Sequence, residues 1–172
     1  MPDMSERGSA EVDRFLDGAA RTVAGAPFSW IATTGESGVP RLRPMGRLPP
    51  EPGDDAWTLR FITDGRSAKA ADIRRFGRVA LAFQREAEEA FVGVVGAARL
   101  EEDGAEVRRR WRRAYDPFFP TDEDKSAAVF LTVAGERLDL WIRGVTPEPF
   151  GLKTTTLVRN GEGRWLLQPD GG

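Results

Sequence analysis

Short strand-like segments separated by short turns most constrain the fold of this chain. Apolar and β-branched residues dominate or alternate with polar ones over residues 28–34, 39–48, 57–63, 78–84, 90–100, 127–134, 137–143, 154–160 and 164–168. Gaps such as Gly35–Gly38 and Gly161–Gly163 hold only turn residues and favour hairpins. Parallel strands would need a crossover helix in each gap. The sequence therefore predicts a mainly β fold, an antiparallel β-barrel or sandwich of Greek-key-like order with appended helices.

Glycines within the expected strands predict two further details. Gly135–Glu136 should form a turn that makes residues 127–134 and 137–143 a hairpin. Gly93 and Gly96 lie inside the strand over residues 90–100, where glycine indicates a bulge, a barrel corner or the close approach of something flat.

Three helices are expected beside the strands, and no repeat or linker divides the chain. Residues 9–23 have the apolar spacing of an amphipathic helix packed on a sheet, with Ser9 as its cap. A second helix follows Ser67, its expected N-cap, and stops at Gly77. We expect one domain over residues 1–172, with an N-terminal helix in 1–25, a barrel core in 26–143 with helices near 67–76 and 105–115, and a C-terminal hairpin and tail in 144–172.

The chain contains no histidine and no cysteine. Their absence excludes disulfides, thiolate metal sites, histidine-dependent hydrolytic triads, and the usual ligands of zinc and haem. The net charge of −2 provides no general attraction for nucleic acid or an anionic membrane. No segment resembles a signal peptide or a membrane span. We therefore expect a cytoplasmic protein without a metal, nucleic-acid or membrane partner.

Two basic segments together predict a phosphate site. Lys69 lies at the start of the helix that follows Ser67, where free N–H groups and the helix dipole already favour an anion. On the strand over residues 39–48, a period of two puts Arg41 and Arg43 on one side. An exposed helix start with incidental cations and a solvated edge strand are the alternatives. If Arg43 and Lys69 converge, one dianion accounts for both segments.

The order of these motifs resembles the FMN-binding split barrel of pyridoxamine 5′-phosphate oxidase-related proteins, and most closely their general stress protein branch. The resemblance covers residues 28–143. Its motifs are RxRPM at residues 41–45, WxxxFxT at 57–63, SxK at 67–69, the glycine-containing strand, and LxLW at 138–141. The resemblance implies that FMN is the cofactor.

The resemblance also implies a role for individual residues. The flavin phosphate would be bound by Arg43, Ser67 and Lys69, and the ring and ribityl chain would lie against Pro44, Met45, Gly46, Ile62 and Thr63. Phe91 would face the cofactor. Trp141 would come from the partner subunit, because proteins of this family are homodimers with flavin at the subunit interface. No catalytic residue is implied.

The basic run Arg108–Arg113 has several interpretations. A solvated helix face, paired with nearby glutamates such as Glu106, is the simplest. A nucleic-acid contact lacks interleaved aromatic residues and a basic net charge. The resemblance favours a position for Trp111 at the dimer interface or the cofactor mouth.

The chain departs from the oxidase itself, which holds its substrate with an arginine and a histidine after the late tryptophan. Here RGVTPEPFG follows Trp141, and histidine is absent. The resemblance thus implies a flavin-dependent oxidoreductase or general stress and redox protein with an unknown small-molecule substrate, and not a pyridoxine phosphate oxidase. A deazaflavin-dependent reductase and a non-catalytic flavin-binding or sensing module are the alternatives.

Overall fold

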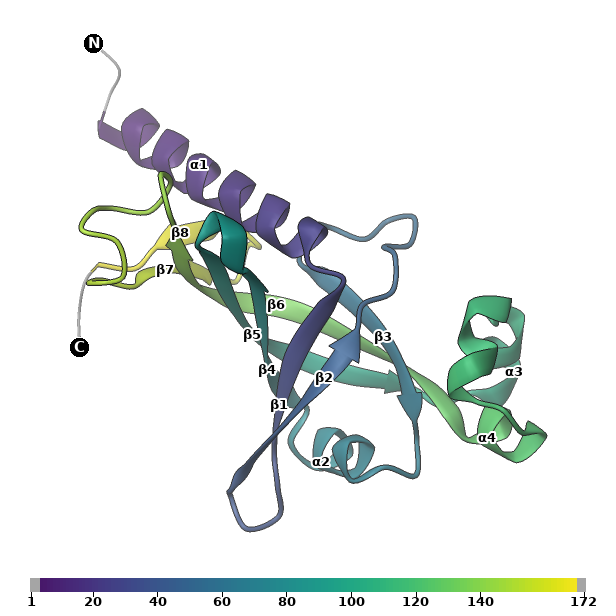
Figure 1. Cartoon of the computed structure of the whole chain (residues 1–172). Helices are drawn as coiled ribbons and strands as arrows, with labels where there is room; N and C mark the ends of the chain where they lie inside the picture. Colours follow the sequence, from purple (N-terminus) through teal and green to yellow (C-terminus); the bar gives the residue numbers. More distant parts are fainter. Residues whose placement is uncertain (1–3, 170–172) are drawn as a thin grey trace.

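The structure is a computed structural model that describes residues 4–169. Its strands form one strongly twisted sheet, in which the neighbouring strands pair antiparallel (Figure 1). The strands are β1 Phe28–Thr34, β2 Pro40–Gly46, β3 Thr58–Asp64, β4 Arg78–Arg85, β5 Ala90–Glu101, β6 Ala128–Ile142, β7 Thr155–Arg159 and β8 Trp165–Leu167. The helices are α1 Met4–Gly25, α2 Ala68–Phe76, α3 Gly104–Arg109 and α4 Asp122–Ala127, with 3-10 turns η1 Glu86–Glu88 and η2 Arg113–Phe118.

The sheet curves into a barrel that stays open between β2 and β3. The strand order is β2-β1-β4-β5-β6-β7-β8, and β3 pairs with β6. Between β2 and β3 the described residues form only an isolated bridge, from Leu48 just after β2 to Arg60 on β3. The predicted mainly β, antiparallel split barrel is therefore confirmed.

One row of apolar side chains marks the inner face of the sheet. Ile31, Leu81, Val94 and Leu138 stand opposite one another on β1, β4, β5 and β6, and all four are buried. The amphipathic helix α1 lies across this side and buries Phe15 against the same core (Figure 1). Each residue one position along from this row points to the outer face, because side chains alternate along a strand.

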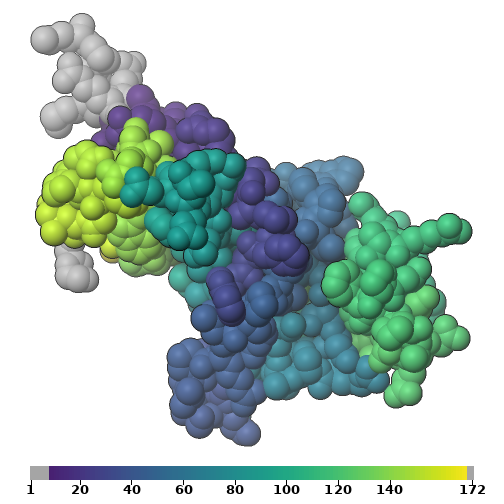
Figure 2. Space-filling view, viewed as in Figure 1, coloured from purple at the N-terminus to yellow at the C-terminus, as the bar shows by residue number. Residues whose placement is uncertain are grey.

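A second, smaller core lies under the segment from α3 to α4. Its buried members are Val107, Tyr115, Phe119, Ala128 and Phe130. This segment, green in Figure 2, stands out from the side of the molecule. It packs on the half of β6 that also pairs with β3.

The predicted hairpin at Gly135–Glu136 is wrong, since β6 runs through both residues as one strand. Gly96 stands opposite Gly135 and Val95 opposite Arg137, so Glu136 is the extra residue of a β-bulge. A Cβ on Gly96 would lie 2.1 Å from the Ala134 carbonyl oxygen, which explains the glycine. Of the three features that a glycine in the strand over residues 90–100 indicated, the structure shows the bulge. Its extra residue lies on the partner strand β6, where it replaces the expected turn.

Two helix boundaries also differ from expectation. The helix expected over 105–115 ends at Arg109, because like charges three and four residues apart disfavour its continuation through the arginine run. The first helix begins before Ser9, at Met4, so Ser9 is not its cap. Residues 1–3 and 170–172 of the expected terminal segments lie outside the described residues. No helix within residues 4–169 combines the length and apolar character needed to cross a bilayer.

Candidate functional site

The turn between β3 and α2 forms the predicted helix start. Ser67 has extended backbone angles, and its hydroxyl accepts a hydrogen bond from the Ala70 N–H at 3.2 Å. Gly77 ends α2 in the left-handed conformation, with φ 61°. The first turn of α2 contains no acidic residue. Its remaining N–H groups and its dipole therefore favour an anion.

Lys69 lies in that first turn as a partly buried cation. Within residues 8–169, no ion pair or hydrogen bond joins its ammonium to another side chain. Burial lowers the pKa of Lys69, and the positive charge of Arg43 lowers it further, while Asp64 acts in the opposite direction. Lys69 and Arg43 thus lie close enough for their charges to interact.

Arg43 is held by a chain of buried polar groups. Its Nη1 donates a hydrogen bond to Thr33 Oγ1 at 2.7 Å, and Thr33 Oγ1 donates to Asp72 Oδ2 at 2.8 Å. Arg41 Nη1 lies 3.8 Å from Asp72 Oδ1. Burial lowers the pKa of Arg43, and Asp72 opposes this effect. Arg41, Arg43 and Lys69 outnumber the two carboxylates that act on them, Asp72 and Asp64, so the cluster favours an anion.

Arg66, also at this turn, is satisfied by carboxylates of the chain itself. It pairs with Asp64 at 2.8 Å, Asp124 at 2.8 Å and Glu123 at 3.2 Å. The hydrogen bonds to Asp64 and Asp124 raise the pKa of Arg66. Of the two cations at the helix start, only Lys69 is therefore available to an external anion.

The segments expected to line a flavin border the opening of the barrel. Met45 points into the core, while its neighbours Pro44 and Gly46 are exposed on β2. On β3, Thr63 is buried on the inner side and Ile62 packs against the second core. The edges of β2 and β3 that face this opening have no strand partner among the described residues apart from the Leu48 bridge.

Three expected residues do not join this cluster within one chain. Phe91 and Trp141 form a cross-strand pair, one position out of register with the buried row and hence on the outer face. Trp111 belongs to the second core, where its Nε1 donates to Asp116 at 3.0 Å and its ring meets Tyr115 edge to face. Within one chain Arg43 and Lys69 thus come together, whereas these aromatic residues lie apart from them.

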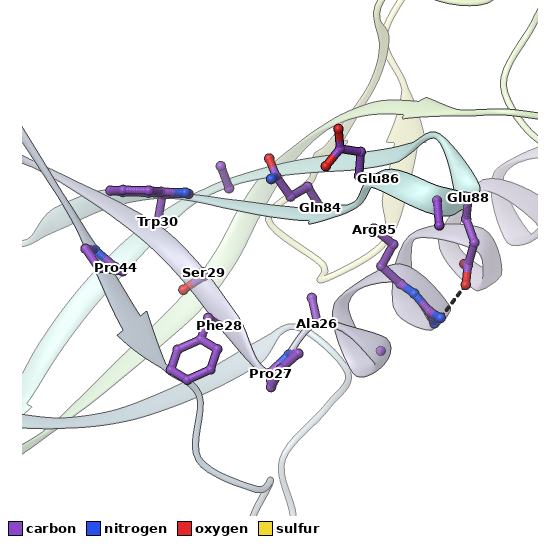
Figure 3. A pocket seen from close by; sticks show the side chains of 13 residues that line it. Ala26, Pro27, Phe28, Ser29, Trp30, Pro44, Gln84, Arg85, Glu86 and Glu88 are labelled. Atoms are coloured by element: carbon purple, nitrogen blue, oxygen red, sulfur yellow. Dashed lines mark ion pairs between the residues drawn. The ribbon is translucent and has the colours of Figure 1, made fainter.

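The outer face contains a hollow that the sequence did not predict. A cavity of about 410 Å³ lies between the start of β1 and the end of β4 (Figure 3). Its walls include Phe28, Trp30, Pro44 and Gln84, and the Arg85–Glu88 ion pair lies at its rim. The sequence of β1 does indicate that something covers its outer face. Large apolar residues occupy both alternating positions of this strand, as in strands that are covered on both faces.

Comparisons with known proteins agree with this architecture. A sequence model of the family described as pyridoxamine 5′-phosphate oxidase matches residues 16–142. No curated protein matches the sequence. Similar solved structures include a Clostridium acetobutylicum protein related to general stress protein 26 of B. subtilis, with 19% identity and a TM-score of 0.68 over 85% of this chain and 95% of that one.

Two other solved structures are also similar. One is a pyridoxamine 5′-phosphate oxidase-related, FMN binding protein from Nostoc punctiforme PCC 73102, with 19% identity and a TM-score of 0.63 over 100% of both chains. The other is an F420 reductase, with 16% identity and a TM-score of 0.55 over 70% of this chain and 95% of that one. Likenesses at these identities show the shared fold. The family model spans most of the sheet and both basic segments, so the chain belongs to the pyridoxamine 5′-phosphate oxidase family.

Proposed function

We propose that this protein binds FMN and acts as a flavin-dependent oxidoreductase or general stress and redox protein. The FMN phosphate binds to Arg43, Lys69 and the N-terminus of α2 at Ser67. The observation that carries this proposal is the partly buried ammonium of Lys69, which lies beside the like-charged Arg43 without an ion-pair partner within residues 8–169. A phosphate monoester dianion would offset both charges.

The barrel opening supports the position of the flavin ring. Pro44, Met45 and Gly46 border it on one side, and Ile62 and Thr63 on the other. Backbone N–H groups near the ring tune its electronic properties, while the hydride chemistry itself belongs to the bound FMN. The chain's own residues bind, orient and shield the ring. Histidine is absent, so any proton must move through another group or through water.

We further propose that the active form is a homodimer with flavin at the subunit interface. The outer face exposes 65% of Phe28, 44% of Trp30 and 62% of Leu42, and the Phe91–Trp141 pair lies on the same face. Apolar area of this kind is typical of an interaction surface. Packing two such faces together would bring Phe91 and Trp141 of one subunit toward the cofactor of the other.

Absorbance spectroscopy tests the cofactor assignment. The purified protein should show the flavin absorbance spectrum if FMN copurifies with it. If it does not, a fluorescence titration with added FMN should show binding. Arg43→Ala and Lys69→Ala should each weaken FMN binding by about 1–3 kcal/mol, the contribution of a charge-assisted hydrogen bond. Arg164→Ala is the matched control, since Arg164 lies in the turn before β8, at the other end of the strand order from β2. Unchanged affinity in both site variants would refute the proposal.

A deazaflavin cofactor is the second candidate, favoured by the structural similarity to an F420 reductase. Its absorbance band lies at shorter wavelength than that of FMN, and parallel titrations with the two cofactors separate the candidates. A non-catalytic flavin-binding or sensing module would bind FMN equally well. In such a module, no electron donor that is tried would reduce the bound flavin, and no acceptor would reoxidise it.

A further inference from the structure

We propose that Thr33 is a positioning residue that fixes Arg43 for the phosphate, and that Asp72 sets the direction of the Thr33 hydroxyl. This inference rests on the proposed function, because it assigns a role to buried groups behind the same phosphate site. Neither residue belongs to a motif that the sequence marks as functional.

The direction of the two hydrogen bonds defines the role of Thr33. A threonine hydroxyl has one proton and two lone pairs. Thr33 Oγ1 gives its proton to Asp72 Oδ2 at 2.8 Å, so only its lone pairs face Arg43 Nη1, which donates at 2.7 Å. The carboxylate of Asp72 therefore makes Thr33 an acceptor for Arg43.

Burial strengthens these two hydrogen bonds. Thr33 is 2% exposed and Asp72 is 7% exposed, so water does not compete effectively for either group. Asp72 lies on α2 three residues after Lys69, a spacing that brings both to neighbouring positions on one side of the helix. The chain from Asp72 through Thr33 to Arg43 therefore links α2 to β2 across β1. It fixes the position of one phosphate-binding cation relative to the other.

Fixing Arg43 matters because Lys69 repels it. Without the bond to Thr33, the Arg43 side chain would be free to turn toward solvent, and the phosphate would then have to order it on binding. Ordering a long side chain before the ligand arrives reduces the cost of binding. Loss of this bond should therefore weaken binding of a phosphorylated flavin and leave binding of the unphosphorylated flavin unchanged.

The experiment compares FMN with riboflavin, which lacks the phosphate. Dissociation constants of both are measured by fluorescence titration for the wild type, Thr33→Val, Thr33→Ser, Arg43→Ala and the Thr33→Val/Arg43→Ala double variant. Thr33→Val should weaken FMN binding about five- to tenfold, as for one lost hydrogen bond, with riboflavin binding unchanged. Thr33→Ser, which keeps the hydroxyl, should restore FMN binding. In the Arg43→Ala background, Thr33→Val should have no effect.

A structural role would give a different pattern. Equal loss of FMN and riboflavin binding in Thr33→Val, or the same loss with and without Arg43, would overturn the inference. The proposed function fails separately, if the wild type binds FMN no better than riboflavin and neither Arg43→Ala nor Lys69→Ala changes that binding. If Thr33→Val does not fold, as judged by circular dichroism, a crystal structure of the wild type with FMN decides. The inference requires the Arg43–Thr33 bond to persist there, and a released Arg43 would overturn it.

Discussion

Replacing Lys69 by methionine should stabilise the FMN-free protein and weaken FMN binding. The ammonium is partly buried, lies in the first turn of α2 and interacts unfavourably with Arg43. All three conditions oppose a positive charge when no anion is bound, and Asp64 offsets them only in part. Methionine keeps an unbranched apolar stem and removes only the charge. The variant should therefore be more stable than the wild type without FMN and should bind FMN more weakly.

The size of each effect follows from the site. A cation at a helix N-terminus costs about 0.3–1 kcal/mol, and the repulsion from Arg43 adds to it. A gain of about 1 kcal/mol raises the Tm of a protein of this size by about 2–4 °C. Loss of the charge-assisted bond to phosphate should raise the Kd for FMN by about five- to 150-fold, and the stabilisation by added FMN should shrink accordingly.

The assay is thermal unfolding of the FMN-free wild type and variant at pH 7 and pH 10. The pKa of Lys69 in the folded protein lies below the ordinary value of 10.5. At pH 7 the side chain is charged in both the folded and unfolded states, so the penalty is fully present. As pH rises toward 10.5, the folded protein loses this proton before the unfolded chain does, and the penalty fades. The stability advantage of Lys69→Met should therefore be smaller at pH 10 than at pH 7.

Arg164→Met is the control, because Arg164 is an exposed cation paired with Glu162 in a surface turn. Its Tm should change by no more than about 2 °C, as for ordinary surface substitutions. A Lys69→Met variant that is no more stable than the wild type at pH 7 without FMN would refute the reasoning. An advantage that grows with pH would also refute it.

Three further predictions concern the rest of the molecule. Gly96→Ala should lower the free energy of unfolding in urea by about 1–3 kcal/mol, because its Cβ would meet the backbone at 2.1 Å. Gly93→Ala, with its nearest contact at 3.6 Å, should lower it by less than half as much. Equal costs would contradict the bulge geometry. Trp30→Glu should convert the proposed dimer into monomers in sedimentation velocity, since it places a charge on the apolar outer face. An unchanged mass would count against that interface. Asp54→Asn should cost about 1–2 kcal/mol at pH 7, because the carboxylate accepts bonds at 2.6 and 2.7 Å from Arg60, which lower the pKa of Asp54. This cost should disappear as pH falls through the lowered pKa in acid-unfolding curves, and a constant cost would show that the charge is unimportant.

The features that local sequence predicted well are those set by neighbouring residues. The start of α2 at Ser67 and its end at Gly77 follow from capping chemistry within one turn of helix. The order of strands and short turns likewise gave the antiparallel fold. The basic segments were predicted to converge because a single anion explains both, and the interaction between Arg43 and Lys69 agrees with that expectation.

The features that sequence missed depend on residues far apart in the chain. Gly135–Glu136 has the composition of a turn, yet the opposing Gly96 lets it continue as a bulge. The link between Thr33 and Asp72 joins residues 39 positions apart, and no local pattern reveals it. Tertiary context decides both. The position of Trp141 at a subunit interface is not tested by a single chain and stays a prediction.

The isolated bridge between Leu48 and Arg60 gives the barrel a seam. Its backbone hydrogen bond, from the Leu48 N–H to the Arg60 carbonyl at 2.8 Å, contrasts with the continuous ladders that join β1 to β2 and β3 to β6. A single backbone hydrogen bond contributes only about 1 kcal/mol. Packing of Leu48 against the second core and the ion pairs of Arg60 with Asp54 and Glu51 therefore contribute most of what joins the two walls here. Along this line the barrel depends on side chains, whereas elsewhere it depends on continuous backbone ladders.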